Sequence, residues 1–245
     1  FYLKNIYDPP VVLYVKGVLI QNEKSIALVG SRKATSYGFE AGEELAYQLA
    51  SLGITIVSGM ARGIDSSAHK GALRAKGRTI AVLGCGHDIV YPPQNKTLME
   101  DIIENGAVIS EYLPGTAPLP KNFPARNRII SGLSLGVVVV EAAENSGSLI
   151  TANFALEQGR EVFALPGDIN RINSRGTNKL IKEGAKLTTC IEDILEELEI
   201  YNIVNNTASK RTKGNDKSYG LHDQINYKGL NNEERRIVEC LMYEP

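Results

Sequence analysis

The chain has 245 residues, 43% of them hydrophobic and 22% charged, which is typical of a globular protein with one or two domains and a sizeable core. Its net charge of −1 excludes a global basic field, so any binding of anions has to come from locally clustered cations. The sequence shows neither a signal peptide nor an apolar run long enough to span a membrane, which predicts a cytoplasmic protein without membrane contact.

The cysteines and histidines give no sign of a metal or a disulfide framework. Cys85, Cys190 and Cys240 lie far apart and form no CxxC pair, and there are only 3 histidines. This pattern argues against a zinc ribbon, so neither a metal nor a cofactor is expected. The chain begins at Phe1 rather than Met, and its first and last segments are expected to be the ends of a longer protein.

Residues 1–24 are expected to form an extended lead-in, and seven short apolar runs follow it, each succeeded by turn residues and a helical pattern. The runs are continuous rather than alternating, which is typical of parallel strands buried on both faces. The predicted strands are 26–30, 54–59, 79–84, 107–112, 136–142, 161–167 and 185–189. The predicted helices lie near 38–52, 65–75, 94–105, 124–131, 148–158, 177–183 and 191–198.

The alternation of strands and helices with short connections predicts an α/β protein with a doubly wound, mostly parallel sheet over residues 25–200. Ligands of such sheets bind beyond the carboxyl ends of the strands. Residues 201–230 are rich in Asn, Lys, Gly and Ser, a composition typical of a flexible linker. Residues 231–245 carry an apolar helical stripe, and they are expected to begin a small, truncated C-terminal helical domain.

Loops rich in glycine and serine follow several of the predicted strands. Glycines let backbone N–H groups approach a ligand, and helix N-termini favour anions, so these loops are expected to cradle phosphate. The residues expected to do so with their backbone are Gly30, Gly59, Gly63, Ser146, Gly147 and Ser148.

The stretch FPARNRIISGLS (123–134) places Arg126 and Arg128 at the start of a predicted helix. The helix dipole disfavours each cation there by about 0.3–1 kcal/mol, and a bound phosphate would reverse that penalty. Arg32 and Lys121 are expected to join them, and Phe123 is expected to stack on a base. The alternative is that the arginines form ion pairs with Glu111, Glu141 or Glu144.

No combination of residues in the sequence indicates a catalytic site. There is no P-loop and no G-x-G-x-x-G after the first strand, which argues against ATP hydrolysis and NAD. We expect His69 to be solvated or to cap a helix end, Asp65 to cap its helix, and Cys85 to be a small buried hydrophobe. Glu141 is the best single candidate for an acid, without a partner carboxylate.

Several motifs follow one another along the chain in a specific order: VGSR (29–32), SGMARGID (58–65), FPARNRIISGLS (123–134), GVVVVEA with SGSLITA (136–152), ALPG (164–167) and GTNKLI (176–181). In this order they resemble the motifs of the bacterial DNA processing protein A family, also called Smf, and the resemblance covers residues 1–198. It implies an extended Rossmann fold and a protein, not an enzyme, that binds single-stranded DNA in natural transformation, protects it and loads the RecA recombinase. It also implies a homodimer and a C-terminal winged-helix-like domain beginning in residues 231–245.

The resemblance places the arginine of the Gly30-Ser31-Arg32 motif on a DNA phosphate, with basic and aromatic residues around Phe123 completing the pocket. The residues expected to bind DNA are Ser31, Arg32, Arg62, Lys121, Phe123, Asn127, Arg126 and Arg128.

Two other functions fit the same fold. A nucleoside-monophosphate phosphoribohydrolase would carry a P-G-G-x-G-T loop followed by a glutamate, whereas the corresponding loop here reads ENSGSLITA. A sensor of a small signalling nucleotide would use the same phosphate cradle. Release of a free base would indicate the first, and competition between mononucleotides and oligonucleotides would separate the second from a DNA-binding protein.

Overall fold

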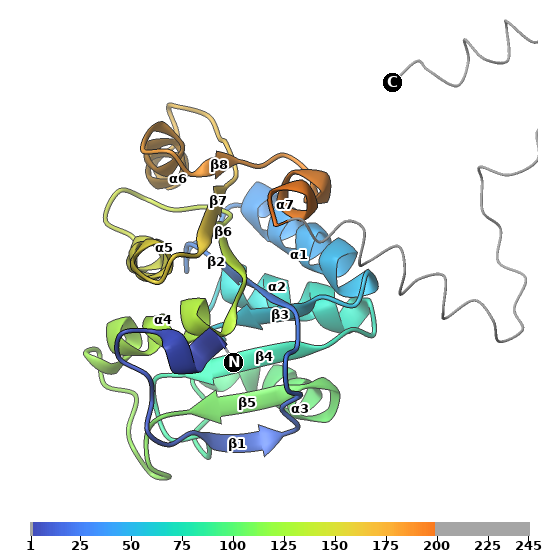
Figure 1. Cartoon of the computed structure of the whole chain (residues 1–245), viewed down its shortest axis with the longest axis vertical. Coiled ribbons are helices and arrows are strands. Elements are labelled where there is room, and N and C mark those ends of the chain that lie inside the picture. Colours follow the sequence, from blue (N-terminus) through green and yellow to red (C-terminus); the bar gives the residue numbers. More distant parts are fainter. Residues whose placement is uncertain (1, 199–245) are drawn as a thin grey trace, which may run out of the picture. The chain divides into compact units, whose positions relative to one another are not determined.

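An eight-stranded sheet forms the centre of the described part of the chain, residues 2–198 of the computed structural model (Figure 1). The predicted linker at 201–230 and the predicted helix at 231–245 lie outside the described residues. The strands are β1 (Tyr14–Gly17), β2 (Ser25–Val29), β3 (Thr55–Ser58), β4 (Thr79–Leu83), β5 (Ala107–Ser110), β6 (Gly136–Val139), β7 (Glu161–Ala164) and β8 (Lys186–Leu187). Their order in the sheet is β1-β5-β4-β3-β2-β6-β7-β8, and every neighbouring pair is parallel except β1 with β5.

Helices cover both faces of this sheet, which gives three layers (Figure 1). One face packs against α1 (Ser36–Ser51), α2 (Ile64–Arg74), α3 (Lys96–Asn105) and α7 (Ile191–Glu197), and the other against α4 (Asn122–Leu133), α5 (Gly147–Glu157) and α6 (Ile172–Lys182). Strands β2 to β6 are buried at every residue, because both of their faces lie in the core. The continuous apolar runs of the sequence follow from this double burial.

The seven predicted strands and seven predicted helices are all present, and the doubly wound, mostly parallel sheet is confirmed. The N-terminal lead-in is more than an extended segment, because Tyr14–Gly17 forms β1 and pairs with β5 at the edge of the sheet. The predicted domain boundary at residue 25 therefore divides one sheet. The pattern gave no sign of β1, since it is four residues long, alternates in exposure and contains Lys16 and Gly17.

The direction in which strands are added to the sheet reverses at β2. From β2 the chain proceeds to β3, β4 and β5 on one side, and then crosses back to β6, β7 and β8 on the other. The loops that follow β2 and β6 consequently diverge and leave a crevice between them. In open α/β sheets this switch point is where ligands bind.

Among residues 2–198, none of the helices has the length and apolar character needed to cross a membrane.

Candidate functional site

A cavity of about 660 Å³ lies at the switch point, beyond the carboxyl ends of β2 and β6. Nine of the residues that the sequence predicts to bind DNA or phosphate line this cavity, and they come from three segments far apart in the sequence: the loop after β2, the start of α4 and the start of α5. These residues are Gly30, Ser31, Arg32, Phe123, Arg126, Asn127, Ser146, Gly147 and Ser148. The sequence thus correctly predicted which loops meet at this edge of the sheet.

The loop after β2 is held in place by Glu141, the second residue after the end of β6. The backbone N–H and the hydroxyl of Thr35 donate to the Glu141 carboxylate at 2.9 and 2.6 Å, and the N–H of Ser31 donates to the Glu141 carbonyl at 2.7 Å. Glu141 is 3% exposed and does not line the cavity. Its carboxylate therefore fixes the loop and the start of α1, where Gly38 leaves room for it, and it is not placed to act as an acid.

The rim of the cavity combines cations with aromatic rings. The Arg32 guanidinium lies 5.3 Å from the centroid of the Phe123 ring, and the Tyr91 ring lies 5.5 Å from that of Phe123. Arg32 and Lys33 are exposed, and neither forms an ion pair with another residue of the described range. The sequence analysis did not predict Lys33 or Tyr91 as site residues. Lys33 could have been found, because it directly follows Arg32. Nothing in the sequence indicated Tyr91.

Arg126 lies at the floor of the cavity and not on its rim. The side chain is buried, with only 3% of the residue exposed, and its Nη1 donates to the carbonyls of Gly59, at 2.8 Å, and of Val82. Burial lowers the pKa of Arg126 to about 10, and the nearby Asp65 carboxylate opposes that shift. Arg126, which the sequence predicts to bind phosphate, is therefore not an exposed cation: its guanidinium fills the space that a side chain at Gly59 would occupy.

Asp65 provides the negative charge that faces Arg126. It lies in the first turn of α2, is buried and lines the cavity, and its Oδ2 accepts from the N–H of Ala61 at 3.3 Å. Burial raises the pKa of Asp65, while Arg126 lowers it. Gly63, and not Asp65, is the N-cap residue of α2. Asp65 thus opposes the charge of Arg126 and, more weakly, that of Arg32. Within residues 2–198, the rim cations Arg32 and Lys33 form no ion pair.

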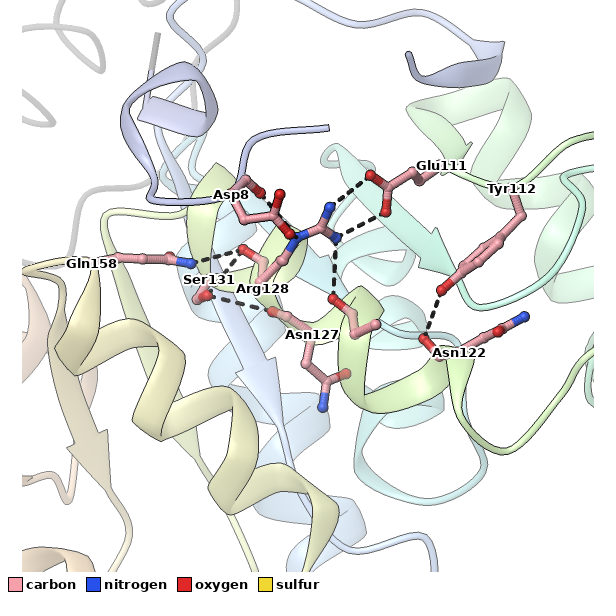
Figure 2. Close-up of polar contacts among 9 residues, drawn as sticks. Asp8, Glu111, Tyr112, Asn122, Asn127, Arg128, Ser131 and Gln158 are labelled. Carbon is pink, nitrogen blue, oxygen red and sulfur yellow. Dashed lines mark hydrogen bonds and ion pairs between the residues drawn. The ribbon is translucent and has the colours of Figure 1, made fainter. Parts of the chain in front are cut away.

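Arg128 faces away from the cavity and forms a structural ion-pair cluster (Figure 2). Its two Nη atoms donate to the two carboxylate oxygens of Glu111 at 2.9 and 2.6 Å, and its Nε donates to the carboxylate of Asp8 at 2.9 Å. The alternative of an ion pair with Glu111 is confirmed for this arginine. The cluster fastens the N-terminal segment and the end of β5 to α4.

The remaining predicted residues fall into two groups. Arg62 and Gly59 line a neighbouring cavity of about 340 Å³, whereas Lys121 is exposed and lines neither cavity. Gly63 also lines neither, because its Cα packs against the Ser31 carbonyl and the N–H of Ile64 donates to that carbonyl at 3.2 Å. The start of α2 thus binds the protein's own Ser31 carbonyl, and Gly63 does not line a ligand site.

His69 and Cys85, which the sequence analysis considered as possible reactive groups, are both buried. His69 is 0% exposed, its Nδ1 lies 2.6 Å from the Thr79 hydroxyl, and burial lowers its pKa to about 3, so the expectation of a solvated or capping histidine is wrong. Cys85 is 1% exposed, and burial raises the pKa of its thiol to about 11. This confirms Cys85 as a small buried hydrophobe.

The fold and the site define a Rossmann-like protein whose switch-point cavity carries exposed cations beside two neighbouring aromatic rings, Phe123 and Tyr91. Comparison with known proteins makes this class more specific. The sequence model of the family "DNA recombination-mediator protein A" matches residues 1–199. The chain belongs to this family.

Similar proteins agree with this membership. The DNA processing protein DprA of Bacillus subtilis is 47% identical over 205 residues, which cover 83% of this chain and 69% of that protein. The crystal structure of DNA processing protein A from Streptococcus pneumoniae superposes with a TM-score of 0.77 at 48% identity, covering 80% of this chain and 70% of that one. The structure of the Helicobacter pylori protein, described for its single-stranded DNA binding mode, gives 0.73 at 32% identity and covers 85% and 92%. These findings confirm the resemblance and the fold.

Proposed function

We propose that this chain binds single-stranded DNA and acts in the processing of DNA taken up in natural transformation. The observation that carries the proposal is the rim of the switch-point cavity, where exposed Arg32 and Lys33 lie beside Phe123 and Tyr91 and form no ion pair with a carboxylate of residues 2–198. Proteins that bind single strands combine a basic groove with aromatic stacking platforms. The single-stranded DNA binding mode described for the H. pylori relative supports the same assignment.

The proposed contacts follow from this geometry. Arg32 and Lys33 neutralise phosphates, and the half-buried ring of Phe123 stacks on a base. The N-terminus of α5 lines the cavity through Gly147 and Ser148, and its dipole favours a further phosphate oxygen. The buried Arg126 also packs against the Phe123 ring, and its guanidinium carbon lies 6.0 Å from the centroid of that ring.

The rival functions predict different ligands for the same cavity. A nucleotide sensor would bind a mononucleotide as tightly as a strand. A phosphoribohydrolase would need a free carboxylate at the ribose, whereas Glu141 is bound by Thr35 and Asp65 lies against Arg126. This arrangement supports a binding protein without enzymatic activity.

Fluorescence anisotropy of a labelled single-stranded oligonucleotide tests the proposal. We expect tight binding that weakens as salt rises, because phosphate neutralisation releases counterions. Duplex DNA and mononucleotides are expected to compete poorly. Absence of binding, or full displacement by a mononucleotide at equal concentration, would refute the proposal and favour the sensor; release of a free base would favour the hydrolase.

Substitution of Arg32 separates the rim from the general charge of the chain. Arg32→Ala is expected to weaken binding of the strand about 10–100-fold, since a charge-assisted hydrogen bond is worth about 1.5–3 kcal/mol. The matched control is Arg74→Ala. Arg74 is also exposed, but it lies at the C-terminal end of α2, outside both cavities, and pairs with Glu43 and Glu44. Equal affinity losses in the two variants would show that the rim has no particular role.

The proposal includes two protein partners that the family resemblance implies, a second copy of the chain and the RecA recombinase. Light scattering of the purified chain tests the homodimer. Filament assembly by RecA on a strand already covered by a single-strand binding protein tests the loading, and the Arg32→Ala variant is expected to lose it together with DNA affinity.

A further inference from the structure

The second cavity adjoins the first along a shared wall. Its volume is about 340 Å³, and Arg32, Lys33, Tyr91 and Phe123 line both cavities. Because the cluster of Arg32, Phe123 and Tyr91 belongs to both linings, it stands where the two cavities meet. A ligand that stacks on Phe123 in the first cavity therefore ends close to the entrance of the second.

The chemistry of the second cavity is that of an anion site with an apolar side. Among the described residues, Arg32, Lys33 and Arg62 are its charged lining residues, and none of the carboxylates of residues 2–198 lines it. Arg62 is exposed and forms no ion pair within residues 2–198. Tyr91, Pro92 and Pro93 supply the apolar surface. The volume is at the lower end of the about 300–1,000 Å³ that is usual for small-molecule sites.

The local backbone holds Arg62 at this place. Met60, two residues earlier, is fully buried, and its carbonyl accepts from the Asn95 side chain at 2.9 Å. Gly63, the next residue, is fixed against the Ser31 carbonyl. The loop between β3 and α2 is thus anchored on both sides of Arg62, and its cation is presented next to Arg32.

We propose that the second cavity binds the neighbouring nucleotide of the same DNA strand, with Arg62 on its phosphate and the surface of Tyr91, Pro92 and Pro93 against its sugar and base. The proposal rests on the single-stranded DNA binding proposed above and extends it. The strand crosses the Phe123 wall, and the shared Arg32 and Lys33 face the phosphate between the two nucleotides. The smallest ligand that fills the whole site is then a dinucleotide, which distinguishes a strand from a mononucleotide.

A length series of 5′-phosphorylated thymidylates with one, two and three nucleotides, titrated by calorimetry, tests the subsite. The wild type is expected to gain at least tenfold in affinity from one to two nucleotides. Arg62→Ala is expected to remove most of that gain and to leave the affinity for the mononucleotide unchanged. Lys70→Ala, an exposed lysine of α2 outside both cavities, is the matched control and is expected to keep the gain.

The outcomes separate this subsite from the proposed function. If Arg62→Ala keeps the full gain from one to two nucleotides while Arg32→Ala weakens all lengths, the strand binds but does not enter the second cavity. If Arg62→Ala weakens one and two nucleotides equally, Arg62 serves the first cavity and the subsite is refuted. If the wild type binds no oligonucleotide, the proposed function itself fails. A melting temperature equal to that of the wild type shows that the exposed Arg62 has no part in folding.

Discussion

Arg32 and Arg126 lie on the same aromatic ring but in opposite environments. Their guanidinium carbons are 5.3 and 6.0 Å from the centroid of Phe123. Arg32 is exposed without an ion pair in the described range, whereas Arg126 is buried, donates to two backbone carbonyls and faces Asp65. The two arginines show that a cation beside a cavity is available to a ligand only where its N–H groups and its charge have no partner within the protein.

The largest expected difference between the two arginines is in stability. Arg126→Ala is expected to lower the free energy of unfolding by about 3–5 kcal/mol, because it leaves a buried carboxylate uncompensated and two carbonyls without their donor. Arg32→Ala is expected to change it by less than about 0.5 kcal/mol. Urea unfolding of both variants measures the difference. Similar stabilities for the two variants would contradict the division into rim and floor.

A second prediction concerns the response to acid, because His69 is buried close enough to Arg126 to be affected by its charge. Its pKa is lowered by burial from 6.5 to about 3, so the unfolded chain binds a proton that the folded chain excludes. Stability is therefore lost as the pH falls from 6.5 toward 3, by about 1.4 kcal/mol per pH unit, or about 2–3 kcal/mol at pH 4.5.

Asp65 contributes with the opposite sign to the same pH profile. Its pKa is raised in the folded state, so just above the ordinary value of 3.8 the folded chain binds more protons than the unfolded one, which favours folding in acid. Chemical unfolding between pH 7 and pH 4.5 measures the sum. His69→Asn, which keeps a donor toward Thr79, is expected to flatten the profile, and an unchanged slope would show that His69 takes no part in it.

The location of the site could be predicted from the sequence, because it depends on the order of strands and on loop composition. Continuous apolar runs predicted the parallel strands, and Gly30-Ser31-Arg32 and Ser146-Gly147-Ser148 correctly predicted the two loops of the switch point. The direction of single side chains could not be predicted. Arg126 and Arg128 are two positions apart, so on a helix they point about 200° apart, and only the folded chain shows that neither points freely into solvent.

The pairing of charges was beyond sequence reasoning for a similar reason. Arg126 faces Asp65 across 61 positions of sequence, and Arg128 reaches Asp8 across 120. Such contacts depend on how helices pack on the sheet. The sequence indicated that the arginines of α4 could pair with glutamates. It could not show whether Arg126 or Arg128 forms such a pair.

The smallest expected effect concerns Arg128, which the sequence predicts to bind DNA and which the structure pairs with Glu111 and Asp8. Glu111→Gln is expected to lower the free energy of unfolding by about 1–3 kcal/mol, since it weakens a two-pronged ion pair in which the arginine side chain is 10% exposed. If Arg128 were part of the DNA site, removing its carboxylate partner would release a cation and strengthen binding of the strand. Because Arg128 lies outside both cavities, the affinity for single-stranded DNA is expected to stay within about twofold of the wild type. Anisotropy titration of Glu111→Gln at low salt checks this, and a clear gain in affinity would return Arg128 to the set of DNA-binding residues.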